Sequence, residues 1–187
     1  MQRRYLLKMK NHVLVDLETL AVGHNAALLS IGAVRFDNNG LYETFYQNID
    51  PLDCIQQGAR ADQRTMDWWK AQDPELQKLT SADPKPLAIS LAKFTAWFEQ
   101  VPNSYIWGFG PSFDCAILED NYKLCKLKTP WTYRNERCGR TIVQFDPSKK
   151  HKKQRRPGHY EHHALYDAIY EAGQIVAVLK EFNLQLP

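Results

Sequence analysis

Acidic and histidine side chains in three separated segments of the chain have the chemistry of a metal site. Asp16 and Glu18 end one apolar run, and Asp114 follows a second such run. The third segment contains His162 and Asp167. Carboxylate oxygens are hard ligands, which suit Mg²⁺ or Mn²⁺ better than zinc. Together these residue types predict a cleft in which carboxylates bind divalent cations beside a histidine.

The first segment, from His12 to Thr19, predicts a strand that is covered on both faces, because its apolar run leaves no solvent face. A strand alternates faces with a period of two, so Asp16 and Glu18 point the same way. Two neighbouring carboxylates repel each other unless a cation lies between them. Taken alone, this pair also fits an acidic strand end in solvent.

The second segment predicts a strand over residues 104–109, which Gly110 and Pro111 end. Ser112 is then expected to N-cap a helix. Asp114 would lie in the first turn of that helix, where the helix dipole favours an anion. A role confined to the dipole is the alternative interpretation.

The third segment leads into a long helix. Its small and apolar residues form a packing stripe of Ala164, Ala168, Ala172, Ile175 and Leu179. Asp167 lies next to or within the buried face of this helix, and thus on a rigid element. Helix geometry alone favours His163 as its partner, since the two residues are one turn apart.

Three motifs in these segments resemble those of the DEDD exonuclease superfamily, in its DEDDh branch: Asp16-Leu17-Glu18-Thr19, Phe113-Asp114 and His162-x-Ala164-x-x-Asp167. Further motifs resemble a bacterial and phage group that contains phage exonuclease A, exonuclease VIII-like and mycobacterial exoribonuclease-like domains. These are Thr65-x-x-Trp68-Trp69-x-x-Gln72, Trp107-Gly108-x-Gly110-x-x-Phe113-Asp114 and Arg137-Cys138-x-Arg140-Thr141. The similarity runs from about Val13 to Val178. One departure is Phe109, where the related pattern usually has Asn.

The resemblance implies an α/β, ribonuclease H-like fold with a mixed central sheet flanked by helices on both faces. A single domain over 1–187, with its core at about 12–182, is expected from the length. Strand patterns lie at about 12–18, 27–37, 41–49 and 104–109, and helical patterns at about 63–72, 87–100, 113–124 and 162–182. The first three strands are expected to be antiparallel, with a turn at 37–40.

The resemblance also assigns roles to the site residues. It implies that Asp16, Glu18, Asp114 and Asp167 bind two Mg²⁺ or Mn²⁺ ions, with Glu18 also counted as catalytic. The family pattern places the general base five residues before the last Asp. It therefore selects His162 over His163.

The implied activity is the removal of 5′-mononucleotides from a free 3′ end of single-stranded DNA or RNA. Similarity to phage exonucleases favours DNA slightly, and an exoribonuclease or oligoribonuclease with the same chemistry is the close alternative. A noncatalytic nucleic-acid-binding module of the same fold is a further alternative. A homodimer is possible, because related proteins include dimers.

Several side chains are candidates for binding the substrate. They are Thr19, Trp68, Phe113 and Arg140, together with a basic segment that contains Lys149, Lys150, Lys152, Lys153, Arg155 and Arg156. The basic segment fits phosphate binding before His162 and fits a solvated loop equally well. Of the adjacent Trp68 and Trp69, we expect at most one to stack on a base.

Composition gives weaker indications. The formal net charge is only +3, so charge alone does not identify a nucleic-acid-binding protein. The four cysteines form no Cys-x-x-Cys pair, which makes zinc ligation improbable and favours free thiols in a reducing compartment. No segment has the pattern of a signal peptide or a membrane span. We therefore expect a cytoplasmic protein.

Overall fold

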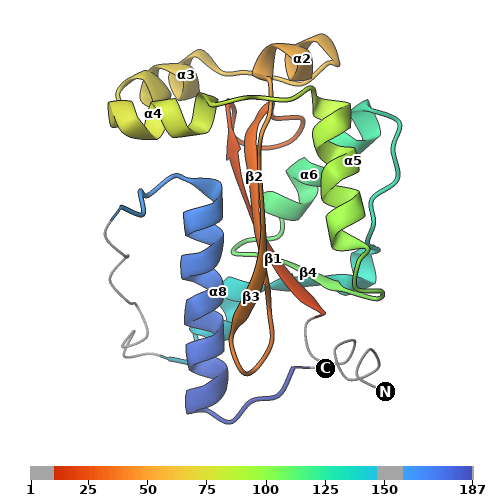
Figure 1. Ribbon diagram of the computed structural model, residues 1–187, viewed down its shortest axis with the longest axis vertical. Coiled ribbons are helices and arrows are strands. Elements are labelled where there is room, and N and C mark those ends of the chain that lie inside the picture. The colour runs from red at the N-terminus through yellow and green to blue at the C-terminus, as the bar shows by residue number, and fades with distance from the viewer. Residues whose placement is uncertain (1–10, 147–157, 187) are drawn as a thin grey trace.

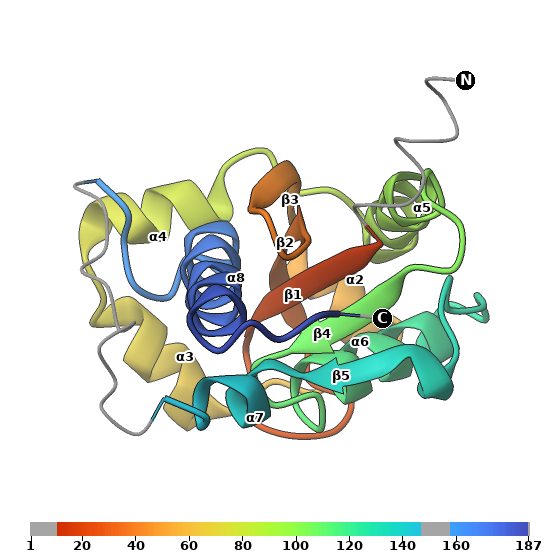
Figure 2. The same cartoon turned by 90° about the horizontal axis from the view of Figure 1, so that it is seen from below.

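The computed structural model describes residues 11–146 and 158–186 of the 187-residue chain. Within them, a five-stranded mixed sheet has the order β3-β2-β1-β4-β5 (Figures 1 and 2). Its strands are β1 (His12–Thr19), β2 (Leu28–Phe36), β3 (Leu41–Asn48), β4 (Tyr105–Gly108) and β5 (Glu136–Cys138). The helices are α2 (Pro51–Gln56), α3 (Gln63–Lys70), α4 (Pro74–Ser81), α5 (Leu87–Phe98), α6 (Asp114–Leu124), η1 (Tyr133–Asn135), α7 (Gly139–Val143) and α8 (Ala164–Glu181).

The sheet has the expected topology. Strands β1, β2 and β3 are antiparallel neighbours, whereas β4 pairs in parallel with β1 and β5 pairs in parallel with β4. Asp37 closes the predicted turn between β2 and β3, since its carboxylate accepts hydrogen bonds from the backbone N–H groups of Asn39 and Gly40. The ribonuclease H-like class and the antiparallel first three strands are therefore confirmed.

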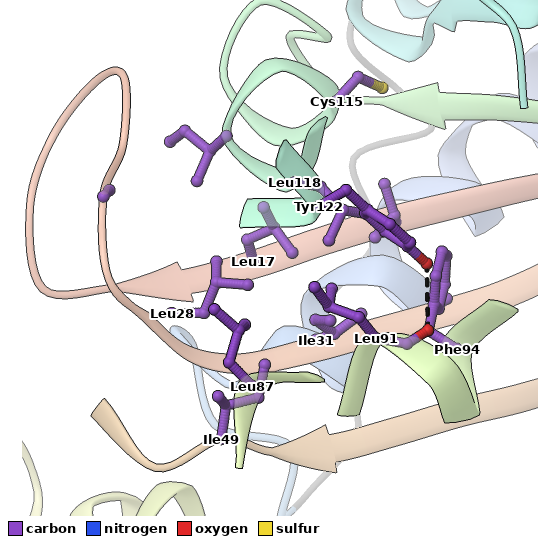
Figure 3. Packing of buried hydrophobic residues seen from close by; sticks show 14 of the residues in the cluster. Leu17, Leu28, Ile31, Ile49, Leu87, Leu91, Phe94, Cys115, Leu118 and Tyr122 are labelled. Atoms are coloured by element: carbon purple, nitrogen blue, oxygen red, sulfur yellow. Dashed lines mark hydrogen bonds between the residues drawn. The ribbon is translucent and has the colours of Figure 1, made fainter. Parts of the chain in front are cut away.

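Helices cover both faces of the sheet. Helices α5 and α6 pack on the face that includes Val13, Val15 and Leu17, and α8 packs on the face that includes Leu14 (Figures 1 and 2). Figure 3 shows the first of these cores, in which the Tyr122 hydroxyl donates a 3.1 Å hydrogen bond to the Leu91 carbonyl. Because side chains alternate along β1, Asp16 and Glu18 fall on the α8 face.

Close packing of α8 against the sheet depends on Gly32 in β2. Gly32 is paired with Asp16 across the two strands. A Cβ at Gly32 would lie only 2.1 Å from the backbone carbon of Ala164, the first residue of α8. The absence of a side chain at Gly32 thus allows the start of α8 to reach β2 at the residue paired with Asp16.

Some predicted boundaries were wrong. The single helix expected at 63–72 ends at Lys70, and a second helix, α4, starts after Asp73, whose carboxylate caps it. Ser112 is not the N-cap of α6, because that position is held by Phe113 without a side-chain capping bond. The short elements α2, β5 and α7 were not expected. Among the described residues, no helix combines the length and the hydropathy that a membrane span requires.

Candidate active site

Glu18, His162 and Asp167 meet on the α8 side of the sheet. One ligand atom from each of the three lies within 4.8 Å of the others, which is a spacing that a bound cation can bridge. Asp16 and Glu18 reach this point from β1, whereas Asp167 projects from the first turn of α8. Side chains alternate along β1, which turns Asp16 and Glu18 to the α8 face, and the start of α8 packs closely on Gly32. Together these features explain why residues so distant in sequence converge.

Asp114 approaches the same region from α6. Its side chain is buried, and a Cβ at Gly108 would lie 2.8 Å from its Oδ2 atom. Gly108 ends β4, next to β1, so Asp114 lies beside the strand that carries Asp16. The acidic residues predicted from three segments are therefore neighbours in space.

The electrostatics of this cluster favour a bound cation. Burial, followed by repulsion from Glu18, Asp114, Glu171 and Asp167, raises the pKa of Asp16 well above its usual 3.8. Burial likewise raises the pKa of Asp114 to about 7, although backbone N–H groups and the charge of Arg140 oppose this rise. Carboxylates crowded in this way are stabilised by divalent cations, whose charge offsets the repulsion.

The two neighbouring histidines occupy different environments. His162 is exposed, has a left-handed backbone with φ of 62°, and donates its backbone N–H to Asp167 Oδ2 at 2.8 Å. His163 is buried and stacks between Tyr46 and Tyr166, with ring centroids 4.4 and 4.1 Å away. Burial lowers the pKa of His163 to about 4. His162 therefore has the solvent-accessible ring beside the carboxylates, whereas the ring of His163 is enclosed.

A cavity of about 710 Å³ opens above the carboxylate cluster. Helix α3 contributes one of its walls, and α3 and α4 lie beyond the end of the sheet in Figure 1. The lining residues are Asp16, Leu17, Glu18, Thr19, Val22, Asp62, Arg64, Thr65, Trp68, Trp69, Phe113, His162 and Asp167. A carboxylate cluster that could hold cations, at the base of an open and partly apolar cavity, is suited to a ligand with both anionic and aromatic parts.

The adjacent tryptophans of α3 differ in exposure. Trp69 is 8% exposed and donates its indole N–H to the Thr19 carbonyl at 2.9 Å, which fixes α3 against the end of β1. Trp68 is 39% exposed and faces the cavity. Only Trp68 therefore has the exposed ring surface for a stacked base.

The other predicted substrate contacts are distributed differently. Phe113 and Thr19 line the cavity, and the Thr19 hydroxyl donates to the Ala21 carbonyl at 2.8 Å, shaping the loop after β1. Arg140 does not line the cavity; its exposed guanidinium lies beside Gly110 and the ring of Phe109. The basic residues Lys149, Lys150, Lys152, Lys153, Arg155 and Arg156 lie outside the described residues.

Sequence patterns did not indicate several residues of this region. Val22, Asp62 and Arg64 line the cavity, and Glu171 adds to the charges acting on Asp16. Asp62 and Arg64 come from the start of α3, which reaches the site only through tertiary packing. The position of Glu171, one turn after Asp167, was a detectable signal, because residues four apart on a helix share a face.

Comparisons with known proteins agree with this arrangement. The family model for the 3′-5′ exoribonuclease Rv2179c-like domain matches residues 11–179. A protein named Exodeoxyribonuclease, from Enterobacteria phage T4, is 30% identical over 121 residues, which are 57% of this chain and 53% of the relative. The chain thus spans about half the length of that curated relative.

Solved structures share the fold at low sequence identity. The nuclease domain of 3′hExo, a DEDDh family member bound to rAMP, has a TM-score of 0.71 at 12% identity, with 96% of each chain covered. Exonuclease X in complex with 5′ overhanging duplex DNA has a TM-score of 0.61 at 14% identity, covering 92% of this chain and 93% of that one. Pop2p of S. pombe, with Mg²⁺ and Mn²⁺ bound, has a TM-score of 0.64 at 12% identity, covering 98% and 88%.

These comparisons and the converging acidic residues lead to one classification. The chain belongs to the Rv2179c-like 3′-5′ exoribonuclease domain family.

Proposed function

We propose that this protein hydrolyses single-stranded nucleic acid from a free 3′ end, using two divalent metal ions and releasing 5′-mononucleotides. The observation that carries the proposal is the convergence of Glu18, His162 and Asp167 within 4.8 Å at a cavity also lined by Asp16. Oxygen donors dominate the cluster, so the residues present fit Mg²⁺ or Mn²⁺. Asp16 and Asp114 extend the cluster towards α6, which provides donors for a second ion.

The acidic residues would hold the metal ions. In this proposal Asp16, Glu18 and Asp167 would hold one ion, and Asp16 and Asp114 would hold the other. When bound, such a pair lowers the pKa of a water molecule and neutralises charge on the leaving 3′ oxygen. The protein part of the reaction is to hold the scissile phosphate beside this water and to remove the water's proton.

His162 is the proposed general base. Its ring is accessible to solvent, and one of its nitrogens lies within 4.8 Å of ligand oxygens from Glu18 and Asp167. Imidazole is the side chain that most often serves as a general base in enzymes. The hydrogen bond from its backbone N–H to Asp167 would keep the base next to a metal ligand.

The sugar of the substrate is the open part of this proposal. Single-stranded DNA is our first candidate, because a relative with 30% identity is named Exodeoxyribonuclease. RNA is the second, since the matching family model is described as an exoribonuclease domain. Phe113 and Trp68 provide exposed or half-exposed rings in the cavity, and such rings stack on bases of either kind. Homodimer formation stays a prediction.

The test is digestion of matched 5′-labelled DNA and RNA single strands with Mg²⁺, with Mn²⁺ and with chelator. We expect a metal-dependent ladder that shortens from the 3′ end, and no ladder with the Asp16→Ala protein. The faster ladder identifies the preferred sugar. If the folded protein binds both strands and cleaves neither, the noncatalytic binding module replaces this proposal.

A further inference from the structure

The charge of the cavity lining poses a problem for a polyanionic ligand. Four carboxylates line the cavity, from Asp16, Glu18, Asp62 and Asp167. Bound cations would neutralise those on the β1 and α8 side, but not Asp62 at the start of α3. Among the described lining residues, Arg64 is the one arginine or lysine. Arg64 is therefore the permanently cationic side chain, among the described lining residues, that can contact a nucleic acid strand in this cavity.

Arg64 is exposed, and the nearby acidic residues of the described structure pair with other groups. The Asp62 carboxylate accepts a hydrogen bond from Arg60, whose other terminal nitrogen donates to the Val22 carbonyl at 2.6 Å. The Asp67 carboxylate accepts from Gln63 at 2.7 Å and from Lys70 at 3.2 Å. Arg64 thus lines an acidic cavity while its acidic neighbours on α3 are occupied.

The position of Arg64 on α3 relates it to the base-stacking surface. Arg64 and Trp68 are four residues apart, so they lie one turn apart on the same face of the helix. The adjacent Trp69 donates its indole N–H to the Thr19 carbonyl, and this contact fixes how α3 is turned towards the cavity. A strand lying along α3 with a base at Trp68 would bring its backbone to Arg64.

We propose that Arg64 binds a phosphate of the substrate strand on the 5′ side of the scissile phosphate; this inference rests on the proposed function. The scissile phosphate belongs at the carboxylate cluster, where the metal ions would bind. A terminal nucleotide with a 3′ hydroxyl has no other phosphate, so every remaining phosphate of the strand lies on the 5′ side. A guanidinium binds such a group with two parallel hydrogen bonds.

Short substrates separate this contact from the chemistry. A dinucleoside monophosphate contains only the scissile phosphate, and each added nucleotide adds one more. We would measure kcat/KM for di-, tri- and tetranucleotides with the wild-type protein, Arg64→Gln and Lys70→Gln. Lys70 provides the matched control, because it lies on the same helix, pairs with Asp67 and does not line the described cavity.

For the wild-type protein and Lys70→Gln, we expect kcat/KM to rise with each added phosphate that reaches the cavity. In Arg64→Gln one of these increments is lost. The ratio of kcat/KM for the longer substrates to kcat/KM for the dinucleotide therefore falls about tenfold, a typical effect of a charge-assisted hydrogen bond. The slope of log Kobs against log salt for a longer strand also becomes shallower by about 0.7.

An Arg64→Gln protein with the wild-type length dependence and salt slope would overturn the inference. So would an equal loss on all lengths, which would place Arg64 at the scissile phosphate or give it a structural role. If the wild-type protein cleaves none of these substrates, nor the longer strands, the proposed function itself fails. The two failures are thus distinguishable.

Discussion

The rings of Trp68 and His162 lie perpendicular to each other, with their centroids 4.7 Å apart. Trp68 belongs to α3 and His162 precedes α8, so this contact joins two walls of the cavity. His162 is otherwise exposed and has a left-handed backbone conformation that is unfavourable for a residue with a side chain. The indole therefore limits the positions that the proposed base can adopt.

Replacing Trp68 by Ala should lower kcat by about 10- to 100-fold, because a misplaced base transfers protons poorly. Trp68→Phe should keep part of the activity, since it keeps an aromatic ring against His162. The independent measurement is the His162 Cε1–H resonance in the metal-free protein, which loses the ring-current shift of the indole in Trp68→Ala. A change in KM alone, with the resonance unmoved, would instead assign Trp68 to base stacking.

Replacing His162 should lower activity, whereas replacing His163 should lower stability. His162→Ala should lose about 10²- to 10⁴-fold in kcat, the usual contribution of a general base, while its melting temperature stays near that of the wild type. His163→Ala removes a buried ring from between Tyr46 and Tyr166, so it should mainly cost stability, by about 1–3 kcal/mol. Denaturant unfolding and single-turnover kinetics measure the two effects. A larger kcat loss in His163→Ala than in His162→Ala would contradict the assignment of the base.

Asp16→Asn should stabilise the protein without metal and abolish its response to metal. The folded-state pKa values of Asp16 and Asp114 are raised above the usual 3.8, so protonated carboxyls at these positions favour the folded state. This contribution to the free energy of unfolding is fully present below pH 3.8. It is lost as the pH rises through about 7, the pKa of Asp114. Asn keeps position 16 neutral at every pH. At pH 8 in chelator, we expect its melting temperature to exceed that of the wild type by about 2–4 °C, the shift for 1 kcal/mol at this size.

Addition of Mg²⁺ provides the second half of that experiment. The wild-type melting temperature should rise with Mg²⁺ concentration, because a ligand that binds only the folded state stabilises it. The Asp16→Asn protein should show little or no rise. Equal stabilisation of both proteins by Mg²⁺ would mean that the ion binds elsewhere.

Gly32→Ala should be far more harmful than a glycine replacement within α8. The new Cβ would meet the backbone of Ala164, so α8 has to move away from β1 and take Asp167 with it. We expect loss of activity and a destabilisation above 2 kcal/mol, as for other overpacked sites. Gly173→Ala is the matched control, since nothing lies within 4 Å of its added Cβ and Ala is the better helix former. Comparable melting temperatures and activity in both proteins would refute the proposed close approach.

Local patterns predicted the elements that carry the acidic residues. The unbroken apolar run before Asp16 predicted a buried strand, and the small-residue stripe of α8, with a period of 3.6, predicted a helix. Both elements were found within two residues of the expected bounds. Asp73-Pro74 carried an unused signal for the start of α4, because Asp caps helices and Pro favours their first turn.

Tertiary packing determined what local patterns did not reveal. Strand β5 is three residues long and half-buried, which leaves no alternation to detect. Arg35 resembles a surface residue in the sequence, yet it is 1% exposed, donates to the carbonyls of Trp97 and Phe98, and lies 4.4 Å from the Trp97 ring centroid. The cavity wall at Asp62 and Arg64 likewise depends on where Trp69 fixes α3, a contact that spans fifty positions of the chain.

The hydrogen bond from the His162 backbone to Asp167 has a consequence for how substitutions in this site are interpreted. Removing the Asp167 carboxylate deletes a proposed metal ligand and also releases the turn that carries the proposed base. The free-energy effects of changes at these two positions should therefore be non-additive, with the double variant little worse than the Asp167 variant alone. Asp16 lies in β1, outside that turn, so substitutions there report on the metal ions without releasing the base.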